Sequence, residues 1–150
     1  RPLQLLIGGD GPLRDKLMRH ARPLGGQCLF LGRMPDEELP QLYRDADLFV
    51  LPTRAIEGFG LVILEAYASG TPVIGTPVGA IAEMVRLQGE GYITTATSAA
   101  AIASAVGQFL DRADKISSQQ LRQVAENYTW KRRAERVLEI YRKIGAAGPT

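Results

Sequence analysis

The chain has 150 residues, of which 45% are hydrophobic and 23% charged, and its formal net charge is +2. These values are typical of one ordinary soluble domain that is long enough to bury a core. The charge is too small to indicate a nucleic-acid surface, and few aromatic residues lie among the basic ones. The single cysteine excludes a disulfide framework and indicates a reducing compartment, so we expect a cytoplasmic protein. No apolar stretch approaches the ~20 residues that span a bilayer, and the first residues do not have the pattern of a signal peptide.

Short apolar runs that end at glycine or proline predict buried parallel strands along the first two thirds of the chain. Four such runs and a weaker fifth lie at residues 3–7, 28–31, 48–51, 72–75 and 91–94. Helical patterns separate them: one begins after Asp10, which can cap it, another begins at Pro35, and a short one is expected at 81–87. The last third is helical, with segments expected at 98–112, 117–127 and 130–144.

Alternation of strand and helix is the pattern of a parallel sheet with helices on both faces. The predicted fold class is therefore α/β, a Rossmann-like doubly wound parallel sheet with a helical C-terminus. We find no internal repeat and no linker, so residues 1–150 are predicted to form a single domain.

The stretch from Glu57 to Glu65 joins the third strand to a helix that we expect from Gly60 to about Ser69. Two glycines flank Phe59 and let the backbone approach a ligand closely. The first amide groups of the helix are unpaired, so they form a potential binding site for a diphosphate. Glu65 is the only charged residue of an otherwise apolar helix, which predicts a buried helix whose carboxylate needs hydrogen-bond donors. The hydroxyls of a bound sugar or ribose would supply them.

Each glutamate also has a purely structural interpretation. Glu57 would be favoured near a helix N-terminus by the helix dipole alone. Glu65 could be paired with a buried arginine or could lie on a narrow hydrated strip. The sequence leaves these alternatives open.

A glycine pair upstream, Gly9 and Gly11, invites comparison with a dinucleotide-binding fingerprint. That fingerprint needs a third glycine where Arg14 stands and an acidic residue about twenty positions later, in the region where Arg33 follows the second strand. NADP binding is therefore disfavoured. The sequence also predicts no metal site, because its one histidine and one cysteine have no ligand partners close in sequence.

Taken together, these motifs resemble the C-terminal donor-binding domain of GT-B retaining glycosyltransferases, the large group 1 family (glycosyltransferase family four). The resemblance rests on the two glutamates with Gly-Phe-Gly after the first. It continues into the segments 65–75, 78–79, 9–12 and 43–52, which occur in the family's order and extend it over nearly the whole chain.

The resemblance implies that the carboxyl-end loops of four strands form one donor cleft for a UDP- or GDP-sugar. Glu65 would accept hydrogen bonds from the ribose hydroxyls. Glu57 would be the catalytic residue, contacting the transferred sugar and stabilising the positive charge that develops at its anomeric carbon. The diphosphate would lie at the start of the helix, at Gly58, Phe59, Gly60 and Leu61. Gly32, Arg33 and Met34 would flank the nucleobase, and Gly9 and Gly11 would line the cleft floor. No cofactor and no metal are implied.

Parts that the resemblance implies are absent from residues 1–150: the acceptor-binding N-terminal domain and the first strand–loop–helix of the donor domain. The latter would carry the arginine and lysine that neutralise the diphosphate. We therefore expect a piece of a two-domain retaining hexosyltransferase that is inactive alone and works with its missing N-terminal domain. The alternative is a non-catalytic nucleotide-sugar-binding module or a degenerate homologue, and a GT-B-type epimerase is less favoured. Membrane contact is not indicated, although the full-length enzyme could be membrane-peripheral.

The absent strand has a structural consequence. In the doubly wound order 3-2-1-4-5-6 the first strand is central, and residues 3–7 and 48–51 would be the second and fourth strands that flank it. An open strand edge invites pairing with another chain. We therefore expect self-association or strand exchange, with closure of the sheet or filling by another segment as the other outcomes.

Overall fold

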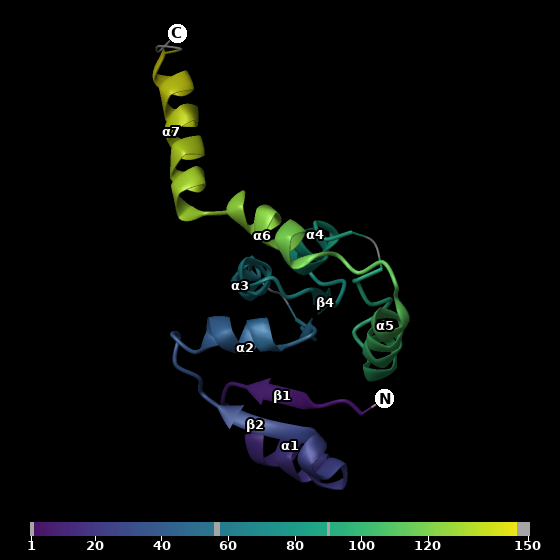
Figure 1. Ribbon diagram of the computed structural model, residues 1–150. Helices are drawn as coiled ribbons and strands as arrows, with labels where there is room; N and C mark the ends of the chain where they lie inside the picture. The colour runs from purple at the N-terminus through teal and green to yellow at the C-terminus, as the bar shows by residue number, and fades with distance from the viewer. Residues whose placement is uncertain (1, 56–57, 90, 147–150) are drawn as a thin grey trace. The chain divides into compact units, whose positions relative to one another are not determined.

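The computed structural model describes residues 2–55, 58–89 and 91–146 (Figure 1). The chain divides into two compact units, Arg1–Leu39 and Pro40–Thr150. The described strands are all parallel and form two separate two-stranded sheets, β1–β2 and β3–β4. If β1 to β4 are the second to fifth strands of the doubly wound order, that order has the same two pairs: the second strand lies beside the third, and the fourth beside the fifth. The α/β class with a helical last third is confirmed, and self-association through an open edge stays a prediction.

The first unit is a strand–helix–strand motif. Its elements are β1 (Leu5–Gly8), α1 (Arg14–Ala21), the 3-10 segment η1 (Arg22–Gln27) and β2 (Cys28–Gly32). Leu5 lies opposite Cys28 in the register, which shifts between Ile7 and Gly8. The expectation of buried strands is wrong for β1, where Leu5 and Leu6 are 50% and 39% exposed. A parallel strand is buried only where neighbouring strands and helices cover it, and β1 pairs with β2 alone among the described strands.

The second unit contains the remaining elements. They are α2 (Leu39–Asp45), β3 (Phe49–Leu51), α3 (Leu61–Ser69), β4 (Val73–Gly75), α4 (Ala80–Arg86), α5 (Ala99–Asp111), α6 (Ser118–Glu126) and α7 (Trp130–Ala146). Phe49 lies opposite Val73 in the β3–β4 pair. The expected fifth strand is reduced to one isolated parallel bridge between Gly75 and Ile93. None of the described helices is long and apolar enough to cross a membrane.

The core of the second unit forms around α3, β4, α4 and α6. Its largest completely buried side chains include Tyr67, Ile63, Ile74, Ile81 and Leu121. Burial of each large apolar side chain contributes about 1.5–3 kcal/mol. Gly75 is required for close packing, because a Cβ there would lie 2.6 Å from Cγ2 of Ile81. The core therefore fixes α3 against β4 and α4.

The C-terminal end of α3 is held by α6, which packs along it (Figure 1). Gly70 ends the helix in a left-handed conformation with φ 89°. The Ser118 hydroxyl donates to the Gly70 carbonyl at 2.8 Å, and Nη2 of Arg122 donates to the Ser69 carbonyl at 3.2 Å. These bonds satisfy carbonyls that every helix end leaves unpaired. The helix that carries Glu65 is thereby anchored at the end opposite to its glycine loop.

Helix starts were predicted well where the sequence offers a capping side chain. Ser98 and Ser117 cap α5 and α6, and Ser117 forms a capping box with Gln120. The helix expected from Pro35 begins instead at Leu39, because residues 35–38 form a turn closed by the Glu38 N–H and the Pro35 carbonyl at 3.0 Å.

Asp10 does not cap α1, contrary to expectation. Its carboxylate accepts the N–H of Gly11 at 2.8 Å, and the cap position belongs to Leu13, which has no side-chain acceptor. Asp10 therefore orders the glycine loop that follows β1 and leaves the helix start without a cap.

Candidate functional site

The start of α3 is an uncapped helix terminus. Gly60 occupies the cap position with φ 72° and ψ 47°, a left-handed conformation that glycine adopts at little cost, and no side chain there accepts a hydrogen bond. The first amides of a helix have no partner within the helix and carry the positive end of its dipole. A helix start of this kind can bind an anion, and the diphosphate position expected at Gly58, Phe59, Gly60 and Leu61 stays a prediction. Glu57 lies outside the described residues, while Gly58 is exposed and Phe59 is 39% exposed.

Glu65 is exposed, so the prediction of a helix buried all round is wrong. Ile63, Ala66 and Tyr67 form its buried face, each with 0% exposure. Leu61 and Glu65 lie one turn apart on the other face, which is open in the described chain. The helix is apolar on both sides, and tertiary packing covers only one of them. The hydropathy of the segment does not reveal which.

The Glu65 carboxylate has a neighbour on another element. The Tyr43 hydroxyl, on α2, donates to Oε2 of Glu65 at 3.4 Å. Burial raises the pKa of Tyr43 to about 12, and the nearby Glu65 charge and hydrogen bond add to the rise. Tyr43 therefore stays protonated and remains a donor at neutral pH. No ion pair of Glu65 occurs in the part of the chain that the structure describes, which argues against a buried arginine partner.

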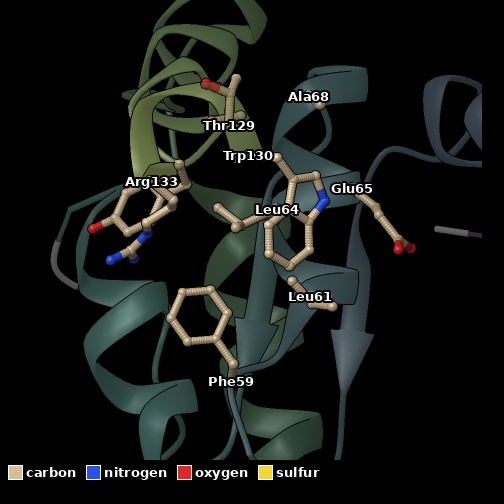
Figure 2. A pocket seen from close by; sticks show the side chains of 10 residues that line it. Phe59, Leu61, Leu64, Glu65, Ala68, Thr129, Trp130 and Arg133 are labelled. Atoms are coloured by element: carbon tan, nitrogen blue, oxygen red, sulfur yellow. The ribbon is translucent and has the colours of Figure 1, made fainter. Parts of the chain in front are cut away.

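An apolar groove of about 560 Å³ lies beside Glu65 (Figure 2). It is lined by residues from the glycine loop, α3, α6, the link between α6 and α7, and the start of α7: Phe59, Leu61, Leu64, Glu65, Ala68, Ala125, Tyr128, Thr129, Trp130 and Arg133. Figure 2 shows Arg133 and the Glu65 carboxylate on opposite sides of this groove. The groove gives the acidic side chain an apolar neighbourhood on the open face of α3.

Arg133 is an exposed residue of α7 whose guanidinium also lies over aromatic rings. Its guanidinium carbon is 5.5 Å from the ring centroid of Phe59 and 5.1 Å from that of Tyr128. The two rings are 6.4 Å apart and tilted by 52°. Stacking of a guanidinium over aromatic rings is favourable, so Arg133 and Tyr128 support the loop that holds Phe59. Sequence reasoning missed Tyr128, and its only signal was its place in the short link between two helical patterns.

The loops that follow β1 and β2 lie together at one end of their sheet. The Gly9 N–H donates to the Gly32 carbonyl at 2.6 Å, and both glycines have positive φ, 109° and 70°. Arg33 is exposed, and Cγ of Met34 lies 3.9 Å from the position that a Cβ on Gly8 would take. The first unit therefore brings these predicted loop residues together.

The loops that follow β3 and β4 are joined in the same way. The Thr76 hydroxyl donates to the Thr53 carbonyl at 2.6 Å, and Thr76 is 1% exposed. Convergence of both loop pairs on one cleft stays a prediction. Among the described residues, no group of three or more histidine, cysteine, aspartate or glutamate side chains is placed to hold a metal ion.

Comparison with known proteins gives consistent matches over this chain. Residues 1–131 match the family model described as "Glycosyl transferases group 1". The D-inositol 3-phosphate glycosyltransferase of Nocardia farcinica is 39% identical over 150 residues, covering 94% of this chain and 33% of that protein.

Two solved structures are similar in fold. Sucrose-phosphate synthase from Thermosynechococcus elongatus matches with a TM-score of 0.79 and 29% identity, over 97% of this chain and 39% of its own. The Anabaena protein HepE, solved in complex with UDP, matches with a TM-score of 0.70 and 26% identity, over 83% of this chain and 36% of its own. The chain thus spans between 33% and 39% of the length of these three proteins.

Proposed function

Because the chain belongs to the group 1 glycosyltransferase family, we propose that it is the donor-binding domain of an enzyme that transfers a sugar from a UDP- or GDP-sugar. The observation that carries this proposal is the open face of α3, where Glu65 stands one turn from an uncapped, glycine-led helix start. The crystallised complex of the similar protein HepE with UDP supports a nucleotide ligand.

In this proposal the diphosphate binds at the amides of Phe59, Gly60 and Leu61. Glu65 lies four residues beyond Leu61, about 6 Å along the helix axis. That separation is comparable to the distance between the phosphates of a nucleotide and its ribose hydroxyls. The carboxylate can therefore accept hydrogen bonds from the ribose while the helix start holds the phosphates.

The transfer itself requires residues beyond those that bind the nucleotide. We propose that Glu57 contacts the transferred sugar, positions it and stabilises the positive charge at its anomeric carbon. The reaction proceeds with retention of configuration in the full-length enzyme. The cations that would neutralise the diphosphate come from a preceding strand–loop–helix, because no arginine or lysine of this chain is assigned to that role. The proposal requires neither a cofactor nor a metal ion, and it places the enzyme in the cytoplasm.

Two exposed apolar surfaces support the proposal that this domain works with an N-terminal partner domain. In β1, Leu5 is 50% exposed, which is what a missing neighbouring strand would leave. On α7, Leu138, Tyr141 and Ile144 are 51%, 66% and 66% exposed. Large exposed apolar patches mark interaction sites, and the matched proteins are long enough to contain another domain.

The test is nucleotide binding by the full-length protein, measured by calorimetry with UDP and with GDP. Glu65→Gln keeps the side-chain volume but removes the charged acceptor, so affinity should fall by about 1.5–3 kcal/mol, roughly tenfold to a hundredfold. Glu139→Gln, an exposed position on α7, is the matched control and should bind like the wild type. Unchanged affinity in Glu65→Gln would show that Glu65 does not bind the nucleotide. A non-catalytic binding module would show the same fall in nucleotide affinity in Glu65→Gln. It would differ from the enzyme only in having no turnover.

A further inference from the structure

The contact between Tyr43 and Glu65 links two segments that are 22 residues apart in the chain. Glu65 lies on the open face of α3, where its long side chain has several rotamers of similar energy. A carboxylate in that situation loses conformational freedom when it binds a ligand, and this loss weakens binding. A donor that holds the carboxylate before the ligand arrives reduces the loss.

Tyr43 is itself held firmly enough to act as that donor. Its ring packs edge-on against Phe49 of β3, with centroids 5.3 Å apart and planes at 86°. Its main-chain carbonyl accepts a hydrogen bond from the hydroxyl of Thr71, a residue that is 2% exposed. Tyr43 is thus fixed through its ring to β3 and through its backbone to the segment after α3.

We propose that Tyr43 is a positioning residue for ribose recognition: its hydroxyl orients the Glu65 carboxylate toward the ribose hydroxyls of the donor nucleotide. This inference rests on the proposed function of Glu65. An ionised carboxylate has about four acceptor positions. Tyr43 occupies one of them on Oε2, so Oε1 and the remaining position on Oε2 stay available to the 2′ and 3′ hydroxyls. The tyrosine contributes a neutral donor and adds no charge that would compete for the phosphates.

The length of the contact sets the size of the expected effect. At 3.4 Å it is longer than the ~2.7–2.8 Å of a well-formed hydroxyl hydrogen bond. We therefore expect Tyr43 to orient the carboxylate with a modest contribution, about that of one ordinary hydrogen bond.

The test compares two nucleotides on the full-length protein. The first is whichever of UDP and GDP binds the wild type more tightly, and the second is its 2′,3′-dideoxy form. The ratio of their dissociation constants measures recognition of the ribose hydroxyls alone. The variants are Tyr43→Phe, Glu65→Gln, the double variant, and Tyr67→Phe as control. Tyr67 lies on the same helix as Glu65, but its hydroxyl donates to the Met84 carbonyl in the core.

Tyr43→Phe should lower the discrimination ratio about threefold to tenfold, the typical net contribution of one hydrogen bond. The double variant should have the same ratio as Glu65→Gln, because Tyr43 acts only through Glu65. Tyr67→Phe should keep the wild-type ratio.

The outcomes separate this inference from the proposed function. If Glu65→Gln abolishes the discrimination but Tyr43→Phe keeps the wild-type ratio, or weakens both nucleotides equally, the role of Tyr43 is refuted while that of Glu65 stands. If the wild type does not discriminate and Glu65→Gln changes nothing, the ribose role of Glu65 is refuted, and the role of Tyr43 is refuted with it.

Discussion

The two faces of α3 differ in what covers them and in what they do. On one face Ile63, Ala66 and Tyr67 have 0% exposure and pack into the core. On the other, Leu61 is 50% exposed and Glu65 meets only the hydroxyl of Tyr43 among its described partners. The same helix therefore supplies stability through one face and, in our proposal, a binding surface through the other. A site residue can be exposed and still be accurately placed when the opposite face of its helix is locked.

The buried face should dominate stability. Tyr67→Ala removes a completely buried ring and its bond to the Met84 carbonyl. Loss of a buried aromatic side chain costs about 3–5 kcal/mol, which urea unfolding should detect as a large fall in the free energy of unfolding. Leu61→Ala, on the open face of the same helix, should change stability by only about 0.5 kcal/mol. Equal effects of the two substitutions would contradict the difference between the faces.

Changing Gly70, where α6 holds the C-terminal end of α3, should have a smaller effect on stability, and Gly107 provides a control. Gly70→Ala places a Cβ in a left-handed conformation, 2.8 Å from Cβ of Ser118 and from Nη2 of Arg122. The conformation and the overpacking together should destabilise the protein by about 2–4 kcal/mol. Gly107 lies inside α5, where no heavy atom is within 4 Å of an added Cβ. Gly107→Ala should stabilise by about 0.5–1 kcal/mol. If thermal or urea unfolding showed that both substitutions change the free energy of unfolding in the same direction, the contact of α3 with α6 would not be the anchor.

The sequence predicted those features that depend on local chemistry. The helix expected from Gly60 to about Ser69 is observed as Leu61–Ser69, because glycine marks both of its ends. Ser98 and Ser117 likewise mark the starts of α5 and α6. The alternation of strands and helices in the first two thirds of the chain also follows from local periodicity.

The rest depends on contacts between distant segments, which no local pattern contains. The exposure of Glu65 depends on which side of α3 is covered by β4, α4 and α6. Tyr43 could be recognised only as part of a helical face or a family motif, since its hydroxyl on α2 meets a carboxylate on α3 that is 22 residues away in the chain. At Asp10 and Pro35 even the local pattern was ambiguous, because aspartate and proline occur in turns as well as at helix starts.

The most direct test of the open face of α3 is to observe its amide groups while a nucleotide binds. In the isotope-labelled full-length protein, adding UDP or GDP should shift the amide resonances of Phe59, Gly60 and Leu61 by NMR. The amides at the start of α6, where Ser117 already caps the helix, should not move. This pattern would show that the uncapped start of α3 holds the diphosphate. If the nucleotide binds but the amide resonances of Phe59, Gly60 and Leu61 do not move, the proposed site is contradicted.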